Sequence, residues 1–217
     1  QPQTAEWSPY NHRLYQQVKT LGVPVNFIEE EDAFDQFNVL IAPYYQIVTR
    51  ELIDKLAAYV RQGGHLVLGC RSGQMNPEGK FWKGEWAEPI QDLIGGKVEY
   101  FDTIPSSIKA KIRMGDQNYL WNNWAEVLTP DEGTEVWARH ANQFYAGEAA
   151  VTHFKLGEGT VTYIGVDTDD GALERAVLQR VYAEAELEIL DLPPGLCVEY
   201  RDGFGVAVNY HTETRRA

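Results

Sequence analysis

The pattern of hydrophobic positions between residues 39 and 73 predicts a strand, a helix and a second strand. A short apolar run, Val39–Ala42, stops at Pro43, and apolar residues then recur at helical spacing over residues 52–60. A Gly-Gly pair at 63–64 ends the helix, and His65–Gly69 has the pattern of a second buried strand. A strand that is apolar on both faces and follows a crossover helix is typical of a parallel sheet covered by helices. The segment therefore predicts one β-α-β unit.

The flanking segments predict further helices and strands on both sides of this unit. Residues 9–21 have the apolar stripe of a helix and residues 23–28 that of a strand, whereas residues 71–86 form a loop rich in glycine and aromatic residues. The spacing of Leu120, Trp124 and Val127 fits helix packing. The remaining expected elements are a short helix at 89–94, strands at 97–101, 108–114, 134–139, 149–155 and 161–166, a hairpin turn at 156–159 and a helix at 172–185.

The residue pattern of the chain changes after the Pro-Pro pair at 193–194. Two short apolar runs flank an Asp-Gly turn at 202–203, which predicts a β-hairpin. A hairpin alone is marginally stable, so we expect this one to pack on the preceding domain. We therefore divide the chain into a domain at residues 1–190 and the start of a small β domain at residues 191–217.

Composition and charge exclude several classes of partner. The 217 residues are 44% hydrophobic and carry a formal net charge of −13, enough for one main domain with a sizeable core. An acidic balance disfavours binding to nucleic acid or anionic membranes, because those surfaces require clustered Lys and Arg. No apolar run reaches the roughly 18 residues of a membrane span, and residues 1–8 lack the pattern of a signal peptide. Without an initiating Met, the sequence is expected to be a mature or excised piece.

Cofactor and metal motifs are absent from the sequence. The loop after Val39–Ala42 has neither the Gly-x-Gly-x-x-Gly nor the Gly-x-x-x-x-Gly-Lys-Ser/Thr pattern, so we expect no nucleotide cofactor. The three acidic residues of the segment VDTDDG, at 167, 169 and 170, follow an expected strand and precede a helix, and helix capping explains them more simply than calcium or phosphate chemistry. The five histidines are not spaced as metal ligands, and we expect no metal site; they are His12, His65, His140, His153 and His211.

Cys70 is the strongest candidate for a nucleophile, because it closes a core strand and a loop follows it. His140 and His153 are the possible partners of a thiol triad. The residues after Cys70 do not read as the helix start that would lower the pKa of a thiol, so a small buried cysteine is the simpler interpretation. A disulfide between Cys70 and Cys197 is not expected.

Tryptophans in the loop at 71–86 and near residue 121 are the most suggestive side chains. Tryptophan is favoured both in sugar-stacking sites and in the centres of protein interfaces. We take four residues as candidate substrate-binding or interface residues: Arg71, Trp82, Trp86 and Trp121.

Read in order, five blocks carry a family resemblance: the β-α-β unit, RSG at 71–73, KGEWAEPIQDLIGG, WAEVLTPDEGTEVWARH and AVTHFKLGEGTVTYIGV. Together they resemble the middle domain of glycoside hydrolase family 42 beta-galactosidases, over about residues 8–187. The resemblance implies a class I glutamine-amidotransferase-like, flavodoxin-like α/β fold, with a mainly parallel sheet and helices on both faces. A short C-terminal β segment would follow.

The resemblance also implies a function without chemistry of its own. In that family the middle domain serves trimer formation, and the two catalytic glutamates lie on an N-terminal (β/α)8 barrel of about 250 residues, which this chain cannot contain. We therefore expect no catalytic residue here, a homotrimer, and a parent enzyme that hydrolyses terminal beta-D-galactosides, whose barrel is the other partner. The alternatives are an amidotransferase-like or amidohydrolase-like enzyme that uses Cys70 and a sugar-binding module built on Trp82 and Trp86.

Overall fold

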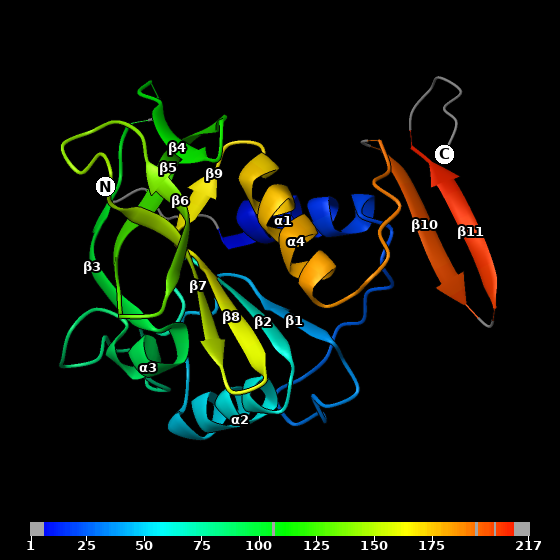
Figure 1. Cartoon of the computed structure of the whole chain (residues 1–217), viewed down its shortest axis with the longest axis horizontal. Coiled ribbons are helices and arrows are strands. Elements are labelled where there is room, and N and C mark those ends of the chain that lie inside the picture. The colour runs from blue at the N-terminus through cyan, green and yellow to red at the C-terminus, as the bar shows by residue number, and fades with distance from the viewer. Residues whose placement is uncertain (1–6, 106, 194, 202, 211–217) are drawn as a thin grey trace.

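The computed structural model describes residues 7–105, 107–193, 195–201 and 203–210. Its helices are α1 (Trp7–Thr20), α2 (Arg50–Arg61), α3 (Gln91–Ile94) and α4 (Ala172–Glu184), with a short 3-10 turn, η1 (Glu88–Ile90), before α3. Its strands are β1 (Val39–Ala42), β2 (His65–Gly69), β3 (Gly96–Asp102), β4 (Ala110–Met114), β5 (Gln117–Pro130), β6 (Glu135–His140), β7 (Ala149–Leu156), β8 (Gly159–Ile164), β9 (Val166–Thr168), β10 (Leu196–Arg201) and β11 (Phe204–Asn209). Figure 1 shows their arrangement.

The main sheet has nine strands and is mostly antiparallel. Only β1 with β2 and β2 with β8 are parallel pairs, and every other pairing described in this sheet is antiparallel. Strand β4 pairs with β5, β5 with β7, β7 with β6 and β6 with β4, so these four strands close a circuit of pairings. The sheet therefore curls into a barrel-like layer.

The expected class I glutamine-amidotransferase-like, flavodoxin-like fold is wrong. The structure is a barrel-like antiparallel β fold with few helices, and not a mainly parallel sheet with helices on both faces. The β-α-β unit of β1, α2 and β2 was correctly predicted, but it does not repeat along the chain. Two-residue connections join β4 to β5 and β7 to β8, and such short links can only join antiparallel strands. A parallel pairing would need a crossover connection at each of these points.

Strand β5 was missed, and the expected helical packing of Leu120, Trp124 and Val127 is wrong. The pairing of β5 with β9 is irregular between Trp121 and Trp124. Both tryptophans are therefore buried, although residues three apart on a regular strand point to opposite faces. A bulge of this kind imitates the spacing of a helix. From Ala125 to Leu128 every residue is buried, which removes the alternation that marks a half-exposed strand.

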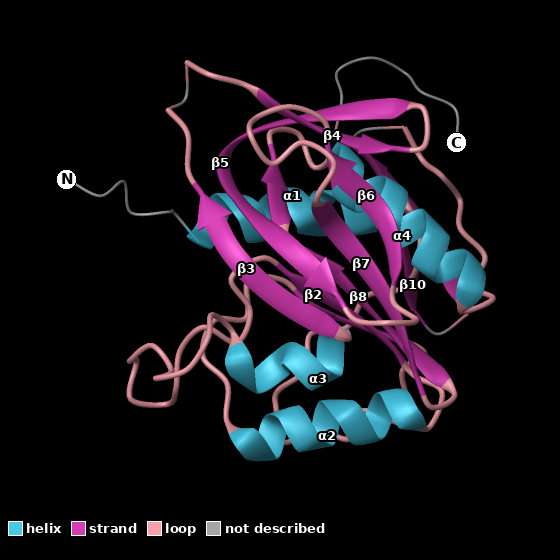
Figure 2. Cartoon of the chain, turned by 60° about the vertical axis from the view of Figure 1, so that its left-hand side comes forward, coloured by secondary structure: helices cyan, strands magenta, loops and turns pink. Residues whose placement is uncertain are grey.

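Two hydrophobic cores lie on opposite faces of β2 and β8. Val67 packs in the core that includes residues of α1 and α4, whereas its neighbours Leu66 and Leu68 pack in the core that includes residues of α2 and α3. Neighbouring side chains of a strand point to opposite faces, which explains this division. Figure 2 shows the sheet between these two pairs of helices. Within the described part of the chain, no helix is both long and apolar enough to cross a membrane.

The strand expected at residues 23–28 does not form. Pro24 has no N–H to donate to a strand partner, and Phe27 is 84% exposed. Val23 and Val25 still pack against the core of α1 and α4. The segment is therefore a loop, with no strand pairing in the part of the chain that the structure describes.

The C-terminal hairpin of β10 and β11 forms as predicted, as a separate two-stranded sheet. Glu199 of β10 pairs with Lys19 of α1, and the backbone N–H of Leu192 donates to Thr20 O at 2.7 Å. Figure 1 shows the hairpin beside α1 and α4, away from the nine-stranded sheet. The hairpin is thus attached to the main domain mainly through β10.

Replacing Gly159 by alanine tests the close packing of the β7–β8 hairpin against the end of α2. A Cβ at this position would overlap the carbonyl oxygens of Val60 and Gly64, which belong to the backbone and cannot move aside cheaply. We expect Gly159→Ala to lower the free energy of unfolding by about 2–3 kcal/mol in urea titration. Gly84→Ala, whose Cβ would come no closer than 3.4 Å to the Glu88 side chain, should change it by less than about 0.5 kcal/mol. Equal midpoints for both variants would contradict this packing.

Candidate functional site

The loops after β1 and β2 each contain a residue with a left-handed backbone. Tyr44 has φ 54° and Arg71 has φ 64°, a region that residues other than glycine adopt rarely. The two loops are tied together, since Gly73 N donates to Tyr45 O at 2.9 Å. Arg71 Nη1 donates to Tyr44 Oη at 2.7 Å, and its guanidinium carbon lies 5.0 Å from the Tyr44 ring centroid. The backbone of two neighbouring loops thus brings these side chains together.

Glu126 of β5 holds the Arg71 backbone in position through a hydrogen bond. Its side chain is fully buried, and Oε1 accepts hydrogen bonds from Arg71 N at 2.8 Å and from Trp124 Nε1 at 3.0 Å. Its Oε2 accepts from Tyr163 Oη of β8 at 2.7 Å. Burial raises the pKa of the Glu126 carboxyl, while the hydrogen bonds from Tyr163, Trp124 and Arg71 act in the opposite direction. One carboxyl group therefore links the end of β2 to β5 and β8.

Cys70 does not have the environment of a nucleophile. Its side chain is 0% exposed, and burial, followed by the charge of Glu126, raises the pKa of the thiol well above its ordinary value. His140 Nε2 instead contacts Glu126 O at 3.1 Å, and His153 stacks on Trp137 with ring centroids 4.1 Å apart. Among the described residues neither histidine has a hydrogen bond to a thiol, and Cys70 and Cys197 are both free.

Thiol labelling checks the burial of Cys70. Because the reactive species is the exposed thiolate, we expect Ellman's reagent at pH 8 to label only Cys197 in the folded protein and both cysteines in urea. Cys197→Ser should then leave no rapidly reacting thiol. Rapid labelling of folded Cys197→Ser would contradict the buried position of Cys70.

The described residues contain no cluster of histidine, cysteine and acidic side chains that could hold a metal ion. His65 and His153 lie on either side of β8 and contact Thr160 and Thr162 of that strand, and His211 is outside the described residues. Two of the three acidic residues at 167–170 are paired: Asp167 with Arg13, and Asp169 with Lys109 at 2.7 Å. The third, Asp170, accepts a hydrogen bond from Ala172 N at 3.0 Å, but the N-cap residue of α4 is Gly171, which makes no side-chain capping bond. The capping interpretation is therefore wrong for Asp167 and Asp169, and only Asp170 bonds a backbone N–H at the start of α4.

Four aromatic side chains form a continuous row beside Arg71. We call this set the aromatic row: Phe81, Trp86, Phe101 and Trp124. Their ring centroids are 5.5 Å apart for Phe81 and Trp86, 4.6 Å for Trp86 and Phe101, and 4.3 Å for Phe101 and Trp124. The Arg71 guanidinium lies 4.6 Å from the Trp124 ring and extends the row toward Tyr44. Phe81 is 57% and Phe101 is 42% exposed, so the outer part of the row faces solvent.

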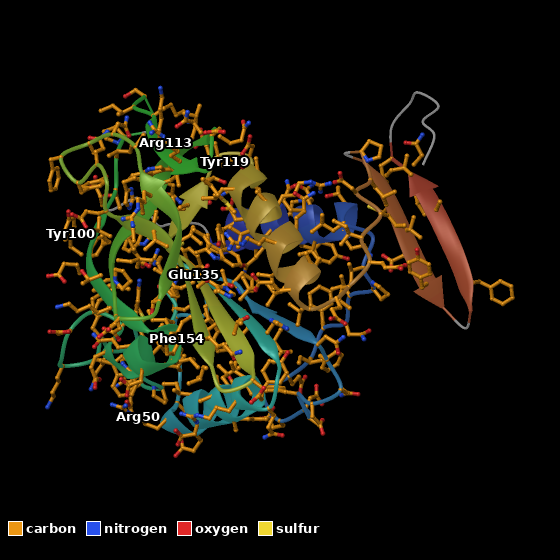
Figure 3. The ribbon with its side chains drawn as sticks, in the orientation of Figure 1. Arg50, Tyr100, Arg113, Tyr119, Glu135 and Phe154 are labelled. Atoms are coloured by element: carbon orange, nitrogen blue, oxygen red, sulfur yellow. The ribbon has the colours of Figure 1, made fainter. Side chains whose placement is uncertain are left out.

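Trp82 and Trp121, the two other tryptophans expected to contribute, lie elsewhere. Trp82 is half-buried and packs on the core of α2 and α3, with the guanidinium of Arg50 5.3 Å from its ring. Figure 3 labels Arg50 at the α2 side of the molecule. Trp121 is 0% exposed in the core of α1 and α4 and offers no surface to a ligand. The structure therefore brings Arg71 and Trp86 together around Trp124. Trp82 belongs to the same loop but contacts Arg50, and Trp121 is buried away from all of them.

Glu126 and Phe101 were not anticipated as parts of the site. Trp124 and Glu126 are two residues apart, so on a strand both side chains point to the same face. Recognition of residues 117–130 as a strand would have placed the Glu126 carboxyl behind the Trp124 indole. Phe101 could have been found from the alternation of residues 97–101, which places it opposite Tyr100 on β3.

A separate hollow lies at the other end of β1 and β2. It has a volume of about 380 Å³, and its lining includes Asp35, Tyr59, His65 and Glu184. His65 begins β2, whereas Arg71 follows its end, so the hollow and the aromatic row occupy opposite edges of the sheet. None of the four expected site residues lines it.

Comparisons with known proteins identify relatives over nearly the whole chain. The chain is 27% identical over 215 residues to beta-galactosidase BgaH from Haloferax lucentense, covering 98% of this chain and 32% of that protein. It is 30% identical over 189 residues to beta-galactosidase LacZ from Heyndrickxia coagulans, covering 87% and 28%. The chain thus spans about a third of the length of these curated relatives.

Solved structures of beta-galactosidases also match this chain over nearly its whole length. The polyextremophilic beta-galactosidase from Halorubrum lacusprofundi matches with a TM-score of 0.90 and 26% identity, over 98% of this chain and 32% of that one. The cold-adapted beta-galactosidase from Rahnella sp. R3 has the same fold, with a TM-score of 0.88 at 22% identity over 96% and 32%. The family model described as the beta-galactosidase trimerisation domain matches residues 2–188. The chain therefore belongs to the trimerisation domain family of glycoside hydrolase family 42 beta-galactosidases.

Proposed function

We propose that this chain is the non-catalytic part of a retaining beta-galactosidase and that it assembles as a homotrimer. The observation that carries the proposal is the match of residues 2–188 to the trimerisation domain model. Relatives three times as long are named beta-galactosidases, which supports a parent enzyme that acts on terminal beta-D-galactosides.

The buried acidic residues of the chain support the absence of hydrolytic chemistry. A retaining glycosidase needs two carboxyl groups about 5 Å apart that face a sugar. Glu126, Asp167 and Glu174 are each at least 98% buried, and each is occupied by internal donors. We therefore assign hydrolysis to an N-terminal barrel of the same polypeptide, which would be the second partner of this domain.

Residues 191–217 are proposed as the start of a small C-terminal β domain. The support is that β10 and β11 form a sheet of their own and that most of β11 is exposed. Within residues 1–190, we propose three contact residues of the assembly, all of them partly exposed: Arg71 and Trp86, which both adjoin Trp124, and Trp82, which precedes Trp86 in the same loop.

Light scattering coupled to size exclusion tests this function. We expect a mass of three times the 24.6-kDa chain at micromolar concentration, together with no hydrolysis of nitrophenyl beta-galactoside above a blank. A monomeric mass at every concentration would contradict the assembly role. Turnover that copurifies with the chain would contradict the non-catalytic role.

A further inference from the structure

We propose that the aromatic row and Arg71 form the surface on which a neighbouring copy of this chain docks, with a carboxylate of that copy bound by the Arg71 guanidinium. This inference rests on the trimerisation function proposed above and names the surface that performs it. The surface combines exposed apolar side chains with a cation that has no counter-ion among the described residues, and both are held rigidly.

The apolar part of the surface extends beyond the aromatic row. Backbone bridges connect Ile47 to Met75 and Met75 to Phe81, and Phe81 then contacts Trp86 of the row. Ile47 is 49% exposed and Phe81 57%, so large apolar side chains from several loops face solvent side by side. Contiguous exposed apolar patches on a soluble protein mark sites of interaction. Aromatic residues are also enriched in the centres of protein interfaces.

Arg71 is the charged group that this surface leaves without a counter-ion. No ion pair of Arg71 with a carboxylate occurs among the described residues, and its Nε atom is buried without a hydrogen-bond partner there. Glu126 bonds the backbone of Arg71 and not its guanidinium. A planar guanidinium can bind a carboxylate through two parallel hydrogen bonds. With a net charge of −13, every copy of the chain presents an excess of carboxylates to its neighbours.

The surface is held in place before any partner arrives. The Arg71 guanidinium lies within 5.0 Å of the centroids of both the Tyr44 and Trp124 rings, and Glu126 anchors the Arg71 backbone and the Trp124 indole. Side chains that are already ordered lose little conformational entropy on binding, which favours association. This distinguishes Arg71 from the flexible lysines and arginines of an ordinary surface.

The symmetry of a trimer decides what meets this surface. In a closed ring of three copies each contact is heterologous, so one patch of a protomer meets a different patch of its neighbour. Away from the threefold axis the aromatic row therefore meets a different patch of the neighbouring copy, and the carboxylate that meets Arg71 comes from that patch.

Sedimentation velocity of variants of the 217-residue chain tests the inference. We expect Phe81→Ser and Phe101→Ser each to weaken trimer formation at least 30-fold, because central aromatic contacts dominate interface energy. The matched control is Phe144→Ser: Phe144 is 87% exposed and stacks on Tyr100, whose side chain lies on the opposite face of β3 from Phe101. Figure 3 labels Tyr100 at the outer side of β3. Circular dichroism melting curves of the variants establish that they are folded.

A cross-linking experiment tests the bound carboxylate. The Arg71→Lys variant places a primary amine at the site, and a carbodiimide joins an amine to a carboxylate only where the two are in contact. We expect a covalent dimer on a denaturing gel, with a junction between position 71 and an Asp or Glu, that is at least tenfold more abundant than in wild type. A cross-link at position 71 found only within one chain would overturn the carboxylate assignment.

The outcomes separate this inference from the proposed function. If wild type is a trimer and Phe81→Ser, Phe101→Ser and Phe144→Ser all remain trimers, the docking surface is wrong while the trimerisation role stands. If wild type is a monomer throughout, the trimerisation role fails and the inference fails with it. If the variants remain trimers but lose a tryptophan fluorescence response to galactose that wild type shows, the surface binds sugar and the inference is overturned.

Discussion

Replacing Glu126 by alanine is expected to lower the free energy of unfolding by about 3–5 kcal/mol. The carboxyl group is fully buried and accepts hydrogen bonds from Arg71 N, Trp124 Nε1 and Tyr163 Oη. Alanine leaves these three donors, and the longer-range donor Gln74 Nε2 at 3.4 Å, in the interior without this acceptor. Each unsatisfied buried donor costs about 1–3 kcal/mol. Urea unfolding followed by circular dichroism at one protein concentration measures the change.

Two further substitutions separate hydrogen bonding from charge and from surface effects. Glu126→Gln keeps one acceptor oxygen, and we expect a loss of only about 1–2 kcal/mol. Glu132→Ala removes an exposed carboxylate in a turn and should change stability by less than about 0.5 kcal/mol. A Glu126→Ala protein that unfolds at the wild-type urea midpoint would show that this carboxyl group does not organise the loop after β2.

Glu174 is expected to make stability depend on pH by about 3 kcal/mol. Burial raises the pKa of this carboxyl from its ordinary value of 4.5 to about 7, although Thr168 N donates to Glu174 Oε1 at 3.0 Å. Between these two pH values the folded protein keeps a proton that the unfolded chain releases. The contribution of Glu174 is therefore fully present below about pH 4.5, falls as the pH rises, and is lost above about pH 7.

The Glu174→Gln variant isolates this contribution, because glutamine preserves the acceptor for Thr168 N and cannot ionise. We expect its stability relative to wild type to improve by about 3 kcal/mol when unfolding is measured at pH 7.5 instead of pH 4.5. Glu188→Gln, at an exposed position, should show no such dependence. A difference between Glu174→Gln and wild type that is constant over this range would contradict the raised pKa of Glu174.

Local patterns predicted single elements well and the complete sheet poorly. The helical spacing of residues 52–60 and the Gly-Gly pair after them correctly placed α2, and the Leu-Gly-Glu-Gly segment correctly predicted the β7–β8 hairpin. The direction of the sheet could not be extended from one β-α-β unit, because it depends on the length of each later connection. Strand β5 could not be recognised from its pattern, since a bulge and burial on both faces hide the alternation of a strand.

The candidate site was likewise predicted only in part. The aromatic loop at 71–86 drew attention to Arg71 and Trp86, which lie together at the surface. Trp121 was chosen with them, but the face on which it lies depends on the bulge in β5. Glu126 was not found, because a carboxylate within an apolar stretch gives no sign in the sequence of the four donors that surround it.

Hydroxyl-radical footprinting across the association range tests the assembly surface most directly. As the mass rises from one chain to three, we predict that oxidation of Phe81, Trp86 and Phe101 falls several-fold, while that of Phe144 stays constant. A threefold mass with unchanged oxidation of Phe81 and Phe101 would contradict the proposal that the aromatic row is the surface on which the copies meet.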